Sequence, residues 1–273
     1  MPRSYHNAVD VWIFFSNSKL LQIFKINKTL CKKLAGYLPQ ARKDIFKLYI
    51  EIVKKHMNSK PNLVIADIGG GSQCLFARYK KPGLRTKIIA VDVSGEELKK
   101  NLDVDEKRVA DIMQSLPFER EEVDIITSRA VLEHLERLDH FINNSTAILK
   151  ENGYFIHLFP SKFSPFAIIN QLLPKWISRK LLYYIRPEHR ETCGFDAFYN
   201  KCYYSGIKTL LEQHDFEIIE IYFSYYQSPY FNFLVPLFLI SAIYEIILNL
   251  INAKNLCAYL LVVARKKPAL EKT

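Results

Sequence analysis

The feature that most constrains the fold is a series of short apolar runs that alternate with polar, helix-like stretches after residue 62. Nearly continuous apolar runs of this length are typical of strands that are covered on both faces of a sheet. The runs lie at 63–66, 88–91, 123–127, 154–159, 216–223 and 257–264. This alternation predicts an α/β fold in which parallel strands are joined by crossover helices.

The composition agrees with a globular protein. Of the 273 residues, 49% are hydrophobic and 24% are charged, which excludes a disordered or low-complexity chain and allows a substantial core. The five cysteines are widely spaced and form no C-x-x-C pair. The apolar stretch 11–15 is too short for a secretory signal. We therefore expect reduced thiols and a cytoplasmic protein.

The net charge of +10 at first indicates a nucleic acid or an anionic membrane as partner. Resolved along the chain, the charge is +9 for residues 1–62, −3 for 63–160 and +4 for 161–273. The basic character thus belongs mainly to the first quarter of the chain. Whatever the middle of the chain binds, bulk positive charge does not attract it there.

Residues 1–61 are expected to form a basic helical extension. Leucines and lysines recur at helical spacing over 18–37, which predicts a basic amphipathic helix, and a second helix is expected at about 43–56. Two interpretations fit the first helix: it packs on the core with its lysines in water, or it docks on a membrane surface.

A glycine turn ends the first apolar run, where Asp67 is followed by Gly69, Gly70 and Gly71. In an α/β sheet a ligand binds at this edge, because glycines let the backbone approach it and a following helix offers free N–H groups. We expect such a helix here. Cys74 stands at the third position of G-x-G-x-x-G, and Asp67 would repel a pyrophosphate. Both features favour a cationic cofactor over a dinucleotide.

Further polar residues follow the next strands. Asp92, with Val93 after it, closes the second run, about where a carboxylate accepts hydrogen bonds from ribose hydroxyls. Asp111 and Ile112 are expected at the end of the third strand, and Ser128 at the end of the fourth.

With the segments Val-Leu-Glu-His-Leu at 131–135 and Leu-Lys-Glu-Asn-Gly at 149–153, the chain resembles class I S-adenosylmethionine-dependent methyltransferases over residues 63–160. It is most similar to the type-eleven group, which includes quinone-biosynthesis enzymes. The resemblance implies a Rossmann-like, doubly wound, seven-stranded sheet of order 3-2-1-4-5-7-6, with only the last strand antiparallel and helices on both faces.

The resemblance also implies S-adenosylmethionine as cofactor. In this family, residues matching Asp67, Gly69 and Gly71 hold the methionyl end. Those matching Asp92 and Asp111 hold the ribose and the adenine amino group, with Ile112 against the ring. The predicted cofactor site also includes three flanking residues: Gly70, Val93 and Ser128.

Three departures from related groups refine the prediction. Gln73 stands where the family's loop often has glycine. Metal-using quinone O-methyltransferases resemble the chain at Glu133-His134, but they carry an acidic ligand where this chain has Ala130, so we predict no metal. The Asn/Asp-Pro-Pro-aromatic motif of amino-methylating nucleic-acid enzymes is replaced by Ser-Arg-Ala at 128–130.

The methyltransferase domain is expected over 62–266, with insertions at 161–205 and 229–254 and a tail at 267–273. Residues 233–251 are long and apolar enough to span a membrane, but family topology makes the flanking strands a hairpin, whose ends must meet. A single span is therefore not expected. The segment is either a lid over the active-site rim or an element in the membrane interface.

The other insertion follows strand five and carries scattered cations: Lys162, Lys175, Arg179, Lys180, Arg186 and Arg190. Nine of the sixteen tyrosines fall between Tyr183 and Tyr230. This concentration favours a substrate surface. Together with the apolar segment, it predicts a small lipophilic acceptor with an anionic or sugar-bearing head, methylated on oxygen or carbon.

Transfer from a sulfonium is an in-line displacement, so the protein mainly aligns the acceptor and excludes water. His134 is the predicted catalytic base, and His157 is expected to be packed in its strand. Peripheral contact with the inner face of a membrane is predicted through 229–254 and the basic helix, and no nucleic acid is expected. Two alternatives stay open: a non-catalytic, membrane-attached protein of this fold, and an RNA methyltransferase.

Overall fold

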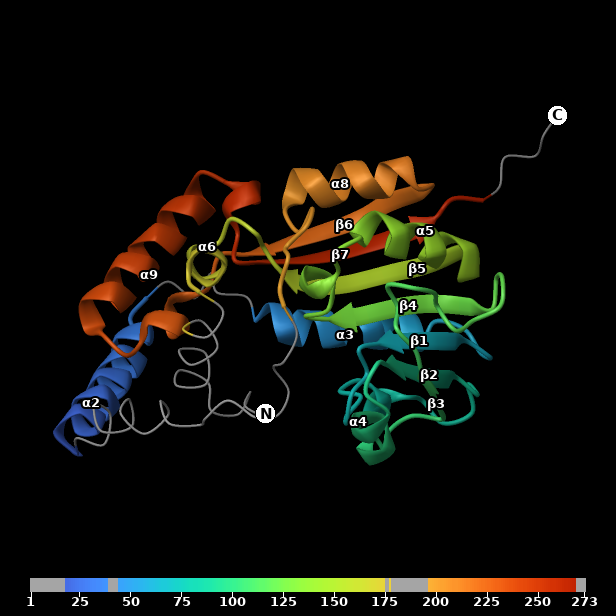
Figure 1. Cartoon of the computed structure of the whole chain (residues 1–273), viewed down its shortest axis with the longest axis horizontal. Helices are drawn as coiled ribbons and strands as arrows, with labels where there is room; N and C mark the ends of the chain where they lie inside the picture. Colours follow the sequence, from blue (N-terminus) through green and yellow to red (C-terminus); the bar gives the residue numbers. More distant parts are fainter. Residues whose placement is uncertain (1–17, 39–43, 175–176, 178–195, 269–273) are drawn as a thin grey trace, which may run out of the picture.

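A seven-stranded sheet forms the centre of the protein (Figure 1). The structure is a computed structural model that describes residues 18–38, 44–174, 177 and 196–268. In chain order the strands are β1 (Val64–Ile68), β2 (Lys87–Asp92), β3 (Glu106–Val109), β4 (Val123–Arg129), β5 (Leu149–Pro160), β6 (Phe216–Ser224) and β7 (Tyr259–Lys266).

The strand order is β3-β2-β1-β4-β5-β7-β6. Strands β1 to β5 pair in parallel, whereas β7 runs antiparallel to both β5 and β6. The predicted Rossmann-like order and the single antiparallel strand are therefore confirmed. Residues 149–153, which were expected to form a turn, belong to β5 instead. Leu149 already pairs with Val123, and the register of the two strands shifts after this pair.

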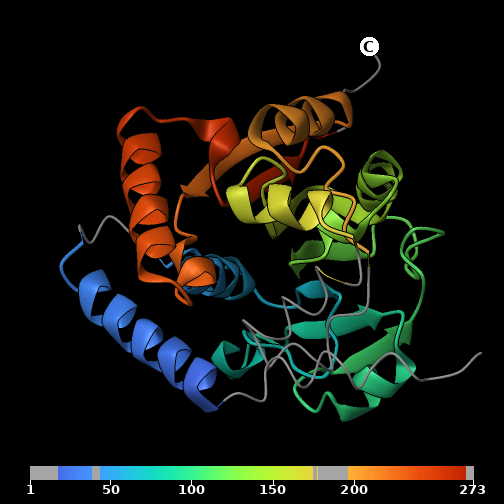
Figure 2. The same cartoon turned by 60° about the vertical axis from the view of Figure 1, so that its left-hand side comes forward.

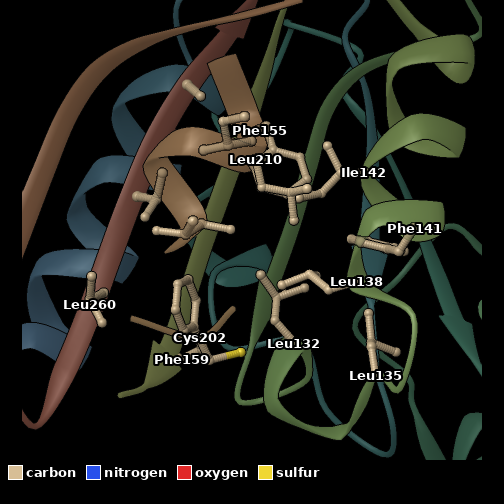
Figure 3. Packing of buried hydrophobic residues seen from close by; sticks show 14 of the residues in the cluster. Leu132, Leu135, Leu138, Phe141, Ile142, Phe155, Phe159, Cys202, Leu210 and Leu260 are labelled. Carbon is tan, nitrogen blue, oxygen red and sulfur yellow. The ribbon is translucent and has the colours of Figure 1, made fainter. Parts of the chain in front are cut away.

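One face of the sheet is covered by α5 (Leu138–Ile148) and α8 (Tyr204–Gln213). Figure 3 shows how Phe141 and Ile142 of α5 and Leu210 of α8 meet Phe155 of the sheet. A fully buried side chain of this size contributes about 1.5–3 kcal/mol to folding. This core therefore fixes both helices on the sheet.

The opposite face is covered by α3 (Ile45–Met57), close to the predicted helix at 43–56. The helix begins after Asp44, whose Oδ1 accepts hydrogen bonds from the N–H groups of Phe46 (3.1 Å) and Lys47 (3.2 Å). Its buried stripe comprises Ile45, Tyr49, Ile52, Val53 and Met57. The expected extension 1–61 thus contains a helix that completes the second layer on the sheet.

Three helices lie beyond the carboxyl ends of the parallel strands, at the left of Figure 1: α2 (Ser18–Ala35), α6 (Pro165–Leu172) and α9 (Val235–Leu250). Helix α9 falls in the predicted insertion 229–254, and α2 packs chiefly against α9. Phe24 of α2 meets Phe233 edge-on, with ring centroids 6.5 Å apart. Within the described ranges, no helix is both long enough and apolar enough to cross a bilayer.

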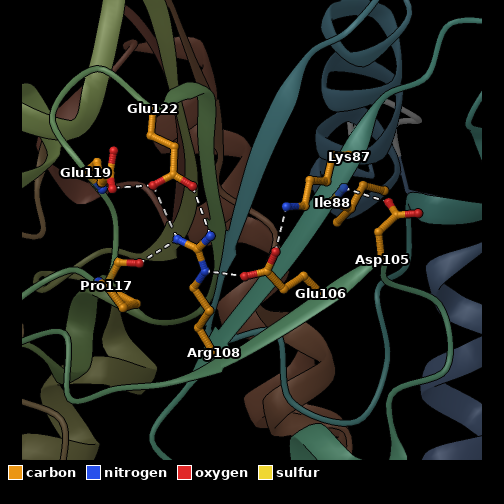
Figure 4. A network of polar contacts seen from close by, with 8 residues as sticks. All are labelled: Lys87, Ile88, Asp105, Glu106, Arg108, Pro117, Glu119 and Glu122. Carbon is orange, nitrogen blue, oxygen red and sulfur yellow. Dashed lines mark hydrogen bonds and ion pairs between the residues drawn. The ribbon is translucent and has the colours of Figure 1, made fainter.

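An ion-pair network holds the edge strand β3 (Figure 4). The guanidinium of Arg108 pairs with Glu106 (2.5 Å) and Glu122 (2.9 Å) and donates to the carbonyl of Pro117 (2.6 Å). Because Pro117 lies in the loop between β3 and β4, the network fixes the path of the chain just after Asp111.

Several sequence predictions fall outside the described residues: those on Lys175, Arg179, Lys180, Arg186, Arg190, Tyr183, Tyr184 and Cys193, and on the tail beyond Pro268. The remaining four cysteines, Cys31, Cys74, Cys202 and Cys257, are free and buried.

Candidate functional site

The glycine turn joins β1 to β2 at the carboxyl edge of the sheet. The N–H groups of Gly69 and Gly70 both donate to the carbonyl of Val91, at 2.8 and 3.2 Å. Gly69 has a φ of +68°, and a Cβ there would lie 2.4 Å from the side chain of Val131. At Gly70 a Cβ would lie 2.8 Å from that of Ala90. Glycine is required at both positions, because a side chain there would collide with Val131 or Ala90.

The helix expected after this turn is not formed, which corrects the sequence prediction. The chain makes only the short 3-10 helix η1 (Ala77–Tyr79) before β2 begins. Cys74 and Phe76 are instead buried in the core beneath α3, and the N–H of Cys74 donates to Asp103 Oδ2 at 3.0 Å. Tertiary burial has overridden helix formation, so the site lacks the free N–H groups of a long helix.

Asp92 closes β2 directly under the turn. Its Oδ2 accepts from the N–H of Gly71 (3.0 Å) and its Oδ1 from the N–H of Ser94 (2.9 Å). Each carboxylate oxygen keeps further acceptor capacity. Val93 beside it is half exposed. The edge here offers a fixed, half-buried carboxylate next to an apolar side chain, as ribose recognition requires.

Asp111 lies two residues after the end of β3, as predicted. Its Oδ1 accepts from the N–H of Met113 and its Oδ2 from Nε2 of Gln114, both at 3.0 Å. Ile112 is half-buried and packs against the core, while Met113 is exposed. The segment therefore presents a carboxylate with apolar neighbours at the strand end next to Asp92.

Asp67 is nearly buried, with 7% of its surface exposed. It lies in register between Ala90 and Thr127 and is hydrogen-bonded to the side chain of Cys74. Burial raises the pKa of this carboxyl group to about 7. A cation bound nearby would favour its ionised form.

Tyr49 of α3 makes a buried contact next to Asp67 that the sequence analysis missed. Its hydroxyl lies 2.8 Å from Oγ1 of Thr127, the register neighbour of Asp67. Burial raises the pKa of Tyr49, so the hydroxyl stays protonated. A polar atom within the apolar stripe of the helix is the only sequence signal for this contact.

Ser128 is not brought to the surface of this edge. Its side chain is fully buried, and Oγ lies 2.6 Å from Nδ1 of His157. His157 packs against the ring of Phe155 at 3.7 Å between centroids, and burial lowers its pKa to about 3. His157 is thus a packed residue, as expected, and Ser128 is its hydrogen-bond partner.

His134 lies in the short helix η2 (Leu132–His134) after β4, at the same edge. Its Nδ1 is 2.9 Å from the carbonyl of Asp196, and partial burial lowers its pKa, which keeps the ring neutral at pH 7. The N–H groups of Phe198 and Tyr199 donate to the carbonyl of Glu133, at 2.8 and 3.0 Å. The end of the insertion after β5 is thus fastened to η2.

The neighbouring Glu133 was not predicted as a site residue. Its side chain is buried, and burial raises its pKa to about 8. One carboxylate oxygen lies 3.9 Å from Nε2 of His134. In the described part of the chain, no three His, Cys, Asp or Glu side chains are grouped as metal ligands would be.

The edge as a whole fits an adenosine-type cofactor with a positive charge. Gly71 has a φ of +40°, and a Cβ there would lie 3.9 Å from Oδ2 of Asp92, in ordinary van der Waals contact. Two half-buried carboxylates with apolar neighbours, Asp92 and Asp111, follow the turn, and the buried carboxyl of Asp67 lies behind it. The chemistry of these donors and acceptors suits a ribose, a base and a cation.

Comparisons with known proteins agree with this geometry. Residues 66–157 match the family model described as a methyltransferase domain. No curated protein matches the chain.

Solved structures share the fold. An S-adenosylmethionine-dependent methyltransferase from Mesorhizobium loti is 16% identical, with a TM-score of 0.52 over 79% of this chain and 96% of that one. A geranyl diphosphate methyltransferase solved with GPP and sinefungin is 13% identical, with a TM-score of 0.52 over 81% and 77%. A putative methyltransferase bound to the Haloferax volcanii Trm112 activator is 14% identical, with a TM-score of 0.50 over 80% and 88%.

The strand order, the glycine turn with its acidic neighbours and the family match converge on one assignment. The chain carries a methyltransferase domain, matched over residues 66–157, in the seven-stranded fold that it shares with S-adenosylmethionine-dependent methyltransferases of known structure.

Proposed function

We propose that the edge formed by Asp67, the glycine turn, Asp92 and Asp111 holds S-adenosylmethionine. Asp67 with Gly69, Gly70 and Gly71 faces the methionyl end, Asp92 and Val93 take the ribose, and Asp111 and Ile112 take the adenine. Ser128 supports the floor of the site from the core side. The bound cofactor supplies an electrophilic methyl group on a sulfonium, and the chain's own residues supply alignment and exclusion of water.

We further propose a small lipophilic acceptor with an anionic or sugar-bearing head. The observation that carries this proposal is an aromatic cluster where β5 ends and β7 begins. Phe166 stacks on Tyr230 at 4.5 Å between ring centroids and lies 5.7 Å from Tyr259, and Phe46 lies 5.1 Å from Tyr259. The hydroxyls of Tyr230 and Tyr259 lie 2.5 Å apart. Such a cluster favours an apolar or ring-shaped acceptor over a strongly hydrated one.

His134 is proposed as the base that takes a proton from the acceptor. A hydroxyl or an acidic carbon must lose a proton during methylation, whereas an amine needs no such base. The lowered pKa of His134 keeps its ring neutral and able to accept a proton at pH 7. The carbonyl of Asp196 holds the ring through Nδ1, and Nε2 lies 3.9 Å from a carboxylate oxygen of Glu133. This arrangement supports O- or C-methylation.

The experiment is transfer of a labelled methyl group. The protein is incubated with methyl-labelled S-adenosylmethionine and with separate lipid and aqueous extracts of cells, and each fraction is counted. The proposal predicts label in the lipid fraction, and much less label at a subsaturating cofactor concentration when Asp92→Ala replaces the wild type. Label confined to the aqueous fraction would contradict the lipophilic acceptor. Label in RNA would instead support an RNA methyltransferase.

A further inference from the structure

Helix α9 is unusual for a surface helix because its exposed side is apolar as well as its buried side. Ile240, Ile243, Ile247 and Leu250 are 50% to 77% exposed. They recur every three or four residues, so they form one outward stripe. The opposite side of the helix, which faces the protein, buries three apolar residues, Phe238, Ala242 and Leu248, together with Ser241 and Glu245.

The only charged residue of α9, Glu245, is buried inside the protein. Glu245 accepts hydrogen bonds from the N–H of Gln227 (2.9 Å) and from that of Ser228, which anchors the helix on η4 (Ser228–Phe231). A helix whose only carboxylate turns inward offers no charge to solvent. Exposed apolar stripes of this kind mark interaction surfaces.

Helix α2 lies beside α9 and adds both apolar and basic groups. In Figures 1 and 2 the two helices form the outer wall of the protein beyond the carboxyl edge. Ile23, Ile26 and Leu30 are 45% to 54% exposed and also share one side of the helix. Four lysines of α2 are exposed, and the helix contains no acidic residue: Lys25, Lys28, Lys32 and Lys33.

We propose that the outward stripes of α2 and α9 are a docking surface for a bilayer that contains anionic lipids. An anionic bilayer matches both features, because acyl chains accept the isoleucines while phosphate groups attract the lysines. A second copy of the chain fits less well, since it would bring one lysine-rich, acid-free helix near another. Docking would turn the acceptor side of the enzyme toward the membrane. The inference does not depend on which acceptor is methylated.

The test is cosedimentation with vesicles, without cofactor or acceptor. Wild-type protein is expected to bind vesicles of phosphatidylcholine with one quarter phosphatidylglycerol, and to bind pure phosphatidylcholine at least about tenfold more weakly, because each lysine near an anionic surface contributes up to about fivefold. The triple variant Ile240→Ser, Ile243→Ser, Ile247→Ser should bind the anionic vesicles at least about tenfold more weakly. Replacing Lys25, Lys28 and Lys32 by Glu should abolish the preference for anionic lipid.

Two control variants change exposed residues of the same types far from this surface. Leu102→Ser, at a position 88% exposed near α4 (Gly95–Lys100), and Lys81→Glu should bind as the wild type does. Thermal melts establish that each variant is folded.

The proposal is overturned if folded wild-type protein does not bind anionic vesicles, or if the isoleucine variant binds them with the same affinity as the wild type. It is also overturned if size-exclusion chromatography shows a dimer that the isoleucine variant dissociates while vesicle binding is absent. That result would assign the surface to a second copy. Because the assay contains no cofactor, failure here leaves the methyltransferase assignment to be tested separately by cofactor binding.

Discussion

The carboxyl edge of the sheet and the outer wall made by α2 and α9 are built on opposite principles. At the edge, backbone N–H groups hold the half-buried carboxylates of Asp92 and Asp111. In the wall, the carboxylate of Glu245 points inward and isoleucines face out. The contrast indicates that the edge meets a polar, cationic ligand and that the wall meets an apolar surface.

The largest expected effect is on the free energy of unfolding, when the buried carboxylate of Glu245 is removed from the wall. Glu245→Ala leaves the N–H groups of Gln227 and Ser228 buried without an acceptor, so the free energy of unfolding should fall by about 3 kcal/mol. Glu245→Gln keeps an acceptor and should cost about 1 kcal/mol. The measurement is chemical denaturation, with Glu212→Ala as the exposed-glutamate control. If only apolar packing held α9 in place, Glu245→Ala and Glu245→Gln would lower the free energy of unfolding by the same amount.

The next effect concerns the chemistry at the edge. His134→Ala should lower turnover about a hundredfold, because general base catalysis contributes at least that factor. The affinity for S-adenosylmethionine, measured by calorimetry, should stay unchanged. His140→Ala, on the outside of α5, should alter neither quantity. Unchanged turnover in the His134 variant would remove this residue from the mechanism.

A smaller effect is expected on cofactor affinity. Asp92→Ala removes a charged acceptor of two ribose hydrogen bonds, so the dissociation constant should rise about thirtyfold, or about 2 kcal/mol. Asp105 is a matched control, because its carboxylate also accepts a backbone N–H, from Ile88 at 2.8 Å, but at the opposite edge of the sheet. Equal losses of affinity in Asp92→Ala and Asp105→Ala would show a general loss of structure. Asp92 at the carboxyl edge would then have no specific part in cofactor binding.

The smallest expected effect is a pH dependence of the cofactor affinity, which concerns only the carboxyl edge. The raised pKa of Asp67, about 7, means that the free protein must release a proton there when a cation binds. The affinity for S-adenosylmethionine should therefore rise about tenfold between pH 6 and pH 8. The stability that this group contributes to the free protein is fully present below about pH 4 and is lost as the pH rises through 7. In Asp67→Asn both trends should vanish, and a persistent rise in affinity would assign it to another group.

The two regions also differ in how far the sequence predicts them. The strand ends that carry Asp67, Asp92 and Asp111 follow from short apolar runs and a glycine turn, which are local patterns. The single antiparallel strand and the strand order came from family resemblance and are confirmed. Local patterns suffice here because each side chain lies within two residues of a strand end.

Long-range packing accounts for what the sequence did not predict. The helix expected after the glycine turn is absent because Cys74 and Phe76 are buried under α3. The contact of Tyr49 with Thr127 joins residues 78 positions apart. Similarly, hydropathy alone located the apolar segment 233–251, but only the structure shows that Glu245 turns inward. Which side of α9 faces solvent is decided by that contact.

Calorimetry of the wild-type protein with S-adenosylmethionine tests most directly whether the acidic edge binds this cofactor. We expect saturable one-to-one binding at pH 8 that weakens about tenfold at pH 6 and about thirtyfold in Asp92→Ala. Absence of binding by folded wild-type protein, or binding that is undiminished in Asp92→Ala, would contradict it and favour a non-catalytic protein of the same fold.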